Sequence, residues 1–307
     1  MDRAKKRVVW LAGAAAALAA GMFAAVWFYR GADASTAALA ARLPSDGAPV
    51  LAVDAAALRR AGILDLLGGA GVDPEPEYKT FVAKTGFDYG RDLDAALVSF
   101  HSTGVYFLLR GRFDWPRLEA YAAEQGGVCV NSVCRMQGSQ PDRRISYYSL
   151  RRDVMALAVS RDEFAATRLS ERRASTLPSR LPAQPVWLLV PSAALQDTGR
   201  LPAGTQLFAK ALQDSVSVTL GLGATGQAFE ASLEVVCRNE REAAVLSTTL
   251  GKITKVLVEM IAREKQTASP RDLSGVLTAG VFRQEGARVL GRWPIQRVFF
   301  EELAGAR

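Results

Sequence analysis

Cys129 and Cys134 lie in the segment GGVCVNSVCRMQG (126–138) and are two of the three cysteines in the chain. A cysteine pair of this kind could bind a metal, carry out redox chemistry or join two strands. A metal site would need two further ligands, and the remaining candidates are Cys237 and the single histidine, His101. The C-x-x-C spacing of thioredoxin-like redox sites is absent. We therefore expect neither a metal site nor a cofactor.

A structural disulfide is the prediction that remains for this segment. If Asn131-Ser132 forms a two-residue turn, Cys129 faces Cys134 across a hairpin, within disulfide range. Asn suits the first position of a type I′ turn, although Ser is a poorer second residue than Gly. An oxidising compartment favours such a bridge. We predict a Cys129–Cys134 hairpin staple with Cys237 left free.

His101 stands in FHSTG, where it could act as general base for Ser99 or Ser102. Adjacent residues on a strand point to opposite faces, however. No G-x-S-x-G segment, typical of serine hydrolases, occurs in the chain. We interpret His101 as a turn residue without a catalytic role and predict no catalytic residue. A hydrolase that uses Ser102 and His101 is kept as the alternative.

Acidic residues cluster in GVDPEPEY (71–78), a loop stiffened by two prolines, and in FDYGRDLD (87–94). In the second segment, the spacing of Asp88, Asp92 and Asp94 does not fill the positions of an EF-hand loop. We expect Asp88 and Asp92 to serve as turn and helix-cap residues. A hydrolase that uses the Asp88–Asp94 cluster belongs to the same alternative.

GLGATG (221–226) matches the dinucleotide-binding pattern G-x-G-x-x-G. That pattern requires a helix after the glycines, whereas AFEASLEVV (228–236) alternates with period two and is predicted as a strand. The glycines are therefore predicted to form a hairpin turn. Tyr147 and Tyr148, adjacent on a predicted strand, are interpreted as one core and one surface residue.

The N-terminus contains an uncharged run of 22 residues, Val8–Tyr29, long enough to cross the roughly 30 Å hydrocarbon core as a helix. Aromatic residues mark its two ends, as is typical of membrane interfaces: Trp10 at one end, and Trp27, Phe28 and Tyr29 at the other. We predict an anchor over 8–29. A cleaved signal peptide is the alternative, with Ala32-Asp33-Ala34 as its A-x-A-like site.

Four basic residues and one acid precede this run. The positive-inside rule places residues 1–7 in the cytoplasm and residues 30–307 in the periplasm or outside the cell. We therefore predict a single-pass protein of the inner (cytoplasmic) membrane, with the lipid bilayer as its partner through the N-terminal helix. Nucleic acid is excluded as a partner by that location.

The net charge is +7, and the segment 142–180 carries nine arginines against five acids. Such an excess favours anionic lipid head groups or an acidic partner. Because acids are interspersed and no aromatic stacking pattern accompanies the arginines, we interpret the segment as a solvated face of mixed sign.

The region after the span shows the same pattern twice, in the order β-α-ββ-α-ββ-α. We predict a linker over 30–42, a first repeat over 43–171, a second linker over 172–184 and a second repeat over 185–305. Period-two alternation in 215–222 and 228–237 indicates a sheet with one covered and one wet side. Segment 273–282 is predicted as a strand, and 161–169 and 294–303 as helices. The expected fold class is α+β, with an antiparallel sheet in each half and helices packed on one face.

KTGFDYGRDLDAALVSF (84–100), which follows a strand–helix start with LP and VD pairs, resembles segments of uncharacterised bacterial single-pass envelope proteins with a duplicated α+β exterior region. The resemblance implies a fold and a location but supplies no catalytic residues.

The sequence therefore predicts a non-enzymatic binding or scaffolding module outside the cytoplasm. A protein partner, or self-association, would use the wet sheet faces or the sheet edges. The alternatives are the hydrolase described above and a protein that binds an apolar ligand such as a lipid. A large apolar cavity would indicate the latter.

Overall fold

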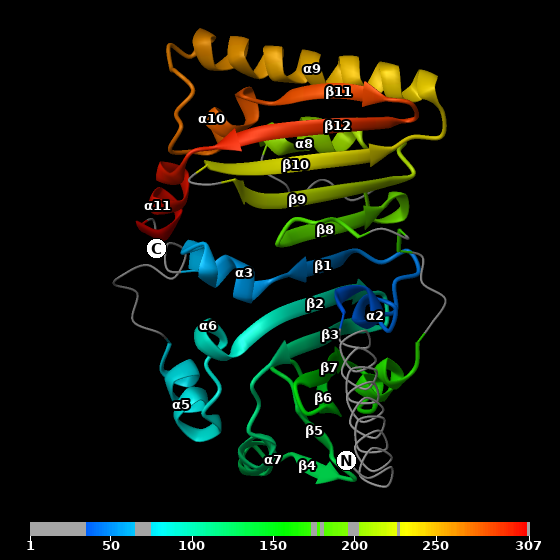
Figure 1. The fold of residues 1–307 in the computed structure, drawn as a ribbon, viewed down its shortest axis with the longest axis vertical. Coiled ribbons are helices and arrows are strands. Elements are labelled where there is room, and N and C mark those ends of the chain that lie inside the picture. The colour runs from blue at the N-terminus through cyan, green and yellow to red at the C-terminus, as the bar shows by residue number, and fades with distance from the viewer. Residues whose placement is uncertain are drawn as a thin grey trace, which may run out of the picture.

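Two short apolar strands from distant parts of the chain pair at the centre of the molecule. Strand β1 (Val50–Val53) runs antiparallel to β8 (Val186–Pro191), with Val50 opposite Leu189. In the computed structural model, which describes residues 35–64, 75–172, 177–178, 181–195, 203–225 and 228–305, this pairing joins two groups of strands into one 12-stranded sheet (Figure 1).

All neighbouring strands in this sheet are antiparallel. Besides β1 and β8 they are β2 (Leu93–His101), β3 (Gly104–Gly111), β4 (Val128–Val130), β5 (Val133–Gln137), β6 (Arg144–Arg151), β7 (Val154–Ser160), β9 (Ser217–Thr225), β10 (Ala228–Val236), β11 (Val281–Glu285) and β12 (Arg288–Ile295). The helices are α2 (Thr36–Ala40), α3 (Ala55–Arg60), α5 (Pro76–Thr85), α6 (Tyr89–Asp92), α7 (Trp115–Glu124), α8 (Ala203–Ala211), α9 (Glu240–Arg263), α10 (Leu273–Thr278) and α11 (Arg297–Gly305), with 3₁₀ turns η1 (Ala165–Ser170) and η2 (Ser192–Leu195).

The strand order from the centre outward is the same on both sides. It runs β1-β2-β3-β7-β6 in the first half and β8-β9-β10-β12-β11 in the second, and the hairpin β5-β4 extends the first half. The prediction of α+β with antiparallel strands is confirmed, whereas that of a separate sheet in each half is wrong. The β1–β8 ladder satisfies backbone groups that two separate sheets would leave at open edges.

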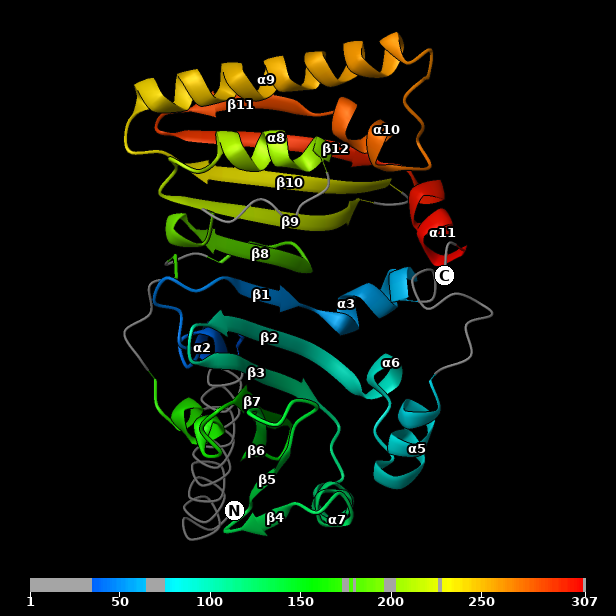
Figure 2. The same cartoon turned by 180° about the vertical axis from the view of Figure 1, so that it is seen from behind.

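Helices cover both faces of the sheet, which corrects the expectation of helices on one face (Figures 1 and 2). We call the side on which α2 and η1 pack the α2 face; its core includes Val50, Leu97 and Tyr106. The opposite face lies against α3, α8, α9, α10 and α11 in the centre and second half, and against α5 and α7 in the first. Tyr147 packs in the core beneath α7 and Tyr148 against the α2-face core, so neither is a surface residue.

Local sequence signals explain most of the elements. Helix α9 begins after Asn239, whose side chain accepts a hydrogen bond from the Glu242 amide at 2.9 Å, and it buries Leu246, Leu250 and Leu257. The predicted hairpins at β2–β3, β9–β10 and β4–β5 are all present.

Three predicted elements differ in type or position. The segment 273–282 begins as helix α10, since Asp272 caps it by accepting from the Ser274 amide at 2.7 Å, and only its end belongs to β11. The helix expected over 161–169 is the 3₁₀ turn η1. Helix α11 starts at Arg297 because Pro294 and Ile295 still pair with β10.

No helix within the described ranges is long and apolar enough to cross a membrane. The predicted anchor over 8–29 lies outside those ranges, as does most of the acidic loop before α5.

Candidate functional site

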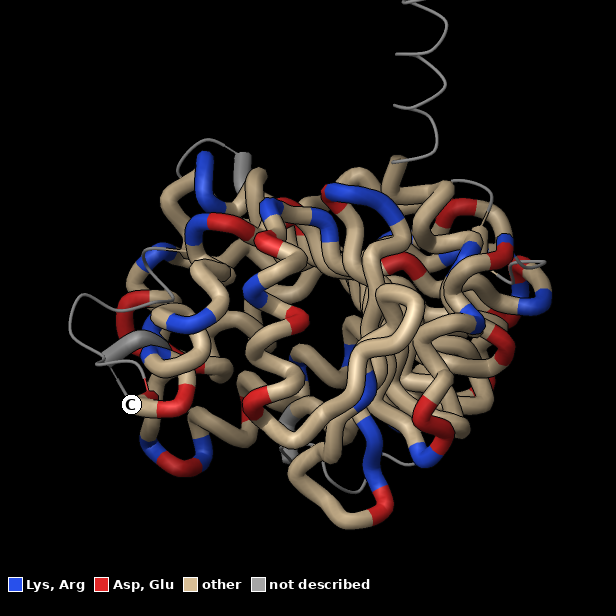
Figure 3. Tube along the Cα trace, turned by 90° about the horizontal axis from the view of Figure 1, so that it is seen from below, with Lys and Arg blue, Asp and Glu red and all other residues tan. Residues whose placement is uncertain are grey.

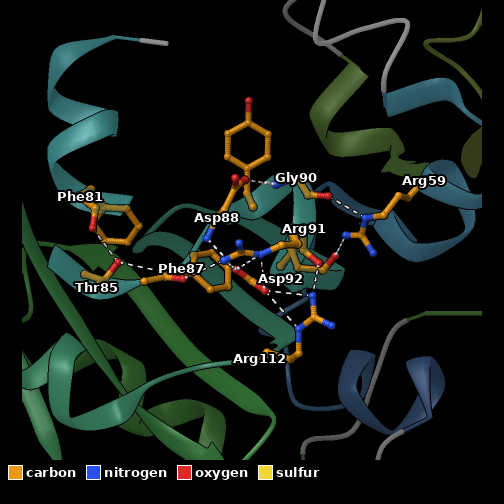
Figure 4. Close-up of polar contacts among 12 residues, drawn as sticks. Arg59, Phe81, Thr85, Phe87, Asp88, Gly90, Arg91, Asp92 and Arg112 are labelled. Atoms are coloured by element: carbon orange, nitrogen blue, oxygen red, sulfur yellow. Dashed lines mark hydrogen bonds and ion pairs between the residues drawn. The ribbon is translucent and has the colours of Figure 1, made fainter. Parts of the chain in front are cut away.

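The acidic segment 88–94 forms a tightly bonded structural corner (Figure 4). The Asp92 carboxylate is nearly buried and accepts hydrogen bonds from the guanidinium groups of Arg91 and Arg112, each at 2.9 Å, and from the Asp88 amide at 3.0 Å. The hydrogen bond from Arg91 is the main cause that lowers the pKa of Asp92 to about 2. A general acid needs a raised pKa, so this carboxylate is suited to structure rather than to proton transfer.

The neighbouring carboxylates are also engaged in the fold. Asp88 is the N-cap of α6, as predicted, and accepts hydrogen bonds from the Gly90 amide at 2.8 Å and the Tyr78 hydroxyl at 3.1 Å. Burial raises the pKa of Tyr78 to about 12. Asp94 lies 4.0 Å from the guanidinium of Arg59. Asp92 does not act as the predicted cap. It instead forms ion pairs with Arg91 and with Arg112, which follows β3.

The hydrogen bonds of the His101 ring are made with Thr103 and not with the nearby serines. The His101 Nδ1 atom lies 2.9 Å from the Thr103 hydroxyl, and its ring packs edge-on to Tyr106. Ser99 is fully buried and donates its hydroxyl to the Pro44 carbonyl. Within the described part of the chain, His101 makes no hydrogen bond to Ser99 or Ser102.

The cysteine hairpin agrees with its prediction. Cys129 and Cys134 are directly opposed and form a disulfide, with Cα atoms 4.0 Å apart. Asn131 and Ser132 have φ angles of 51° and 63°, as a type I′ turn requires. Cys237 is free and buried, and burial raises the pKa of its thiol. The described residues contain no group of three or more His, Cys, Asp or Glu placed to hold a metal.

The second half presents a broad uncovered surface on the α2 face. Along β12, Val289, Trp293 and Ile295 are buried, whereas Arg288 and Arg292, at alternate positions, are exposed. Neighbouring β10 has the same alternation, as the sequence predicted. We call this surface the open sheet face; its outward residues on β9, β10, β11 and β12 include Thr219, Glu230, Ser232, Glu234, Arg283, Arg288, Leu290 and Arg292.

Charges on the open sheet face are paired across strands. Arg288 lies 3.1 Å from Glu234, and Arg292 lies 3.8 Å from Glu230. Pairs of this kind are exposed and add little stability. They make this surface polar, as expected of a sheet face that no helix covers. In the first half the corresponding strands are covered by α2 and η1, so the two halves differ here despite their common strand order (Figure 1).

A pocket of about 520 Å³ lies where β1 and β8 meet α3 and the segment 181–185. Its lining is mostly apolar and includes Ala57, Leu97 and Trp187, with Asp54 and Gln184 among the few polar residues. The Gln184 side chain also donates to the Ser232 hydroxyl at 3.1 Å, so the pocket borders the open sheet face.

The alternation predicted for 228–237 places Glu230, Ser232 and Glu234 on the wet side of β10, whereas no prediction covered Arg288 and Arg292, their neighbours on β12. The alternation in RVLGRWPI (288–295) was the available signal. The pocket was not predictable from any local pattern, since its walls come from α2, β1, α3, β2, β8 and the segment before β8.

Comparison with known proteins assigns no family. No family model matches the chain, and no curated protein matches it. Among solved structures, crystal form IV of TP0453 is similar with a TM-score of 0.48 and 12% identity, over 87% of this chain and 94% of that one. Crystal form I gives 0.47 and 12% over 89% and 98%, and form III gives 0.47 and 10% over 87% and 97%. Similarity this distant transfers no function.

Proposed function

We propose that the protein is a membrane-anchored, non-enzymatic binding or scaffolding module of the cell envelope, and that the open sheet face is its contact surface. In this proposal residues 8–29 form the anchor, residues 1–7 lie in the cytoplasm, and the segments 43–171 and 185–305 are displayed on the other side of the membrane. The partner is a protein or a second copy of this chain.

The observation that carries the proposal is the unequal covering of the α2 face. The two halves share one strand order, yet α2 and η1 cover this face in the first half and leave it bare in the second. An uncovered sheet surface with exposed charge pairs suits contact with a macromolecule more than enclosure of a small substrate. The structural use of Asp88 and Asp92 supports a non-enzymatic role.

Site-specific photocrosslinking in cells tests this proposal. A photoreactive residue at Thr219, on the open sheet face, is expected to give one reproducible crosslinked product, whereas the same residue at Lys252, on the exposed side of α9, gives none. The double variant Arg288→Glu and Arg292→Glu should remove the product because it places like charges beside Glu234 and Glu230.

Two controls separate the possible results. Lys255→Glu, a charge reversal on α9, should leave the Thr219 product intact. The same product from purified chain alone would identify self-association. Absence of any product at Thr219, or equal products at Thr219 and Lys252, would contradict the assignment of this face.

The central pocket supports a second candidate, a protein that binds an apolar ligand. Its volume of about 520 Å³ lies in the usual range for ligand pockets, and its walls are mainly apolar. Displacement of a fluorescent fatty acid from the purified chain measures such binding. Ala57→Phe, which fills the pocket, should weaken it, whereas Ala244→Phe on the exposed side of α9 should not. Equal binding by both variants would remove this candidate.

A further inference from the structure

A polar pocket of about 490 Å³ lies beside the β2–β3 turn and η1, away from the open sheet face. Arg143, Arg161 and Arg168 line it, together with one acid, Asp162, so the lining carries three positive charges and one negative charge. Asp162 lies 2.8 Å from Arg168, and Arg161 lies 3.2 Å from Asp142. The pocket therefore has a net charge of about +2 before the exposed Asp142 is counted. In the view of Figure 3, basic and acidic residues are interspersed along the Cα trace.

Arg143 differs from the other two arginines because its guanidinium is unpaired. No residue in the described ranges accepts a hydrogen bond from this side chain or forms an ion pair with it. Its backbone, in contrast, is fixed: the Arg143 amide donates to the Gln140 carbonyl at 3.0 Å, and its carbonyl accepts from the Gly138 amide at 2.9 Å and from the Gln137 side chain at 3.0 Å. A half-buried cation is thus held at the pocket with its donors available.

Hydroxyl groups complete the lining. Ser160 is buried; it donates to the Thr103 carbonyl at 2.7 Å and accepts from the Asp162 amide at 3.2 Å, which ties the β2–β3 turn to the segment leading into η1. Ser102, exposed in that turn, has a hydroxyl with no partner among the described residues. Guanidinium and hydroxyl donors converge here from three separate segments.

This combination of donors suits a phosphate group. Arginine donates paired hydrogen bonds that match phosphate oxygens, and the pocket keeps a net charge of about +1 even when Asp142 is counted. A carboxylate, with only two oxygens, would leave several of these donors unused. We propose that the pocket binds a phosphate group, carried by a phospholipid head group or as free phosphate.

The location favours the lipid source. Arg42, just after α2, donates to the Ser170 carbonyl at the end of η1, and Arg168 of the same turn lines the pocket. Helix α2 begins directly after the N-terminal segment. If residues 8–29 form the anchor, the six residues from 30 to 35 reach at most roughly 20 Å, which keeps this end of the sheet near the bilayer surface. The choice of source rests on the proposed anchor, but the phosphate site does not.

Titration of the full chain in a non-ionic, phosphate-free detergent tests the site. Inorganic phosphate is one ligand; dihexanoyl phosphatidylglycerol and dihexanoyl phosphatidylcholine, compared below their micelle concentrations, are the lipid arms. We expect saturable binding of phosphate or of the anionic lipid. Arg143→Gln should weaken it at least about tenfold, and Ser102→Ala about threefold. Arg60→Gln, which removes the same charge from exposed α3, should change it less than about twofold.

Binding of phosphatidylglycerol in preference to inorganic phosphate would identify the lipid source, and the reverse would identify free phosphate. Far-ultraviolet circular dichroism establishes whether each variant is folded. If Arg143→Gln does not fold, the effect of Ser102→Ala on binding still tests the site. Absence of saturable binding, or equal weakening by Arg143→Gln and Arg60→Gln, would overturn the proposal. None of these experiments uses a protein partner. A negative result here can therefore be distinguished from a negative result for the proposed contact surface on the open sheet face.

Discussion

Asp92 joins two segments of the first half, α6 with its N-cap and the chain after β3, through one carboxylate. Arg91 approaches from the same helix, Arg112 from the chain after β3, and the Asp88 amide from the start of α6. Both arginines are mostly exposed, whereas the Asp92 side chain is 8% exposed. Removal of the carboxylate therefore leaves no buried cation without a partner. The resulting change in stability measures the hydrogen bonds and ion pairs of Asp92.

The charge of Asp92 should make the protein less stable in acid. A folded-state pKa of about 2, against an ordinary value of 3.8, means that the ionised form contributes fully above about pH 4 and that its contribution disappears as the pH falls toward 2. Asp92→Asn is expected to lower the free energy of unfolding by roughly 2 kcal/mol at pH 7. Urea denaturation at pH 7 and pH 2.5 measures this, and the difference from wild type should shrink at the lower pH. An equal difference at both values would contradict the assignment.

The disulfide gives a second prediction at this scale. Thiol counting on the denatured, unreduced chain should find one free cysteine, Cys237, and three after reduction. Replacing both Cys129 and Cys134 by Ala should cost roughly 2 kcal/mol of unfolding free energy, since the closed loop is short. Three free thiols without reduction would contradict the bridge and would also argue against an oxidising compartment.

Residues whose partners lie close in sequence were the predictable ones. Asp88 as a cap and Cys129 opposite Cys134 follow from local spacing. The bond between Asp92 and Arg112 spans 20 residues, and the phosphate pocket draws on segments around 102, 143 and 161–168. The periodicity of a single segment does not predict contacts between distant segments, because these contacts depend on strand register and strand order.

At the scale of elements, α9 illustrates how one helix covers a sheet edge and a face together. It runs along β11, the outermost strand of the second half, while its inner side packs into the core with Val235 and Trp293 (Figure 2). An edge strand with an adjacent helix is protected against pairing with other chains.

The two sides of α9 should respond very differently to truncation. Leu250 is fully buried, whereas Val245 is 61% exposed. Leu250→Ala is expected to cost about 2–5 kcal/mol because it leaves a cavity, and Val245→Ala less than about 1 kcal/mol. Urea denaturation monitored by circular dichroism compares them. Similar losses for the two variants would show that α9 does not pack as described.

Helices α7 and α9 follow from local sequence signals, since Asp114 and Asn239 cap them and their buried apolar residues recur at helical spacing. Helix α10 was predicted as part of a strand because its apolar residues lie close in sequence to those of β11. Leu273, Val276 and Leu277 have helical spacing, and Asp272 supplies the cap that starts the helix.

At the scale of the whole molecule, both halves contribute to shared cores. The α2-face core joins Leu97 of β2 with Trp187 and Leu189 of β8. A core on the opposite face joins Leu58 and Ile63 of the first half with residues of β10 and α11. The sequence pattern predicted the repeated order of elements but not the pairing of β1 with β8 that connects the two halves. The β1–β8 pairing depends on two edges that each half presents only once it has folded.

The shared cores predict cooperative unfolding. Trp115, Trp187 and Trp293 lie in the first half, the centre and the second half. With 5-fluorotryptophan, their ¹⁹F resonances, assigned by single Trp→Phe changes, should lose native intensity at one urea concentration. A lower midpoint for one half would show that the halves unfold independently.

The central ladder also affects how the chain completes its fold during synthesis. Val50 and its partner Leu189 are separated by about 140 residues, and the ribosome delivers β1 long before β8. Until β8 arrives, β1 is an open edge of apolar residues beside an otherwise finished half. Such a distant pairing is slow to form. The nascent first half is therefore prone to aggregation until the second half has been synthesised and β8 pairs with β1.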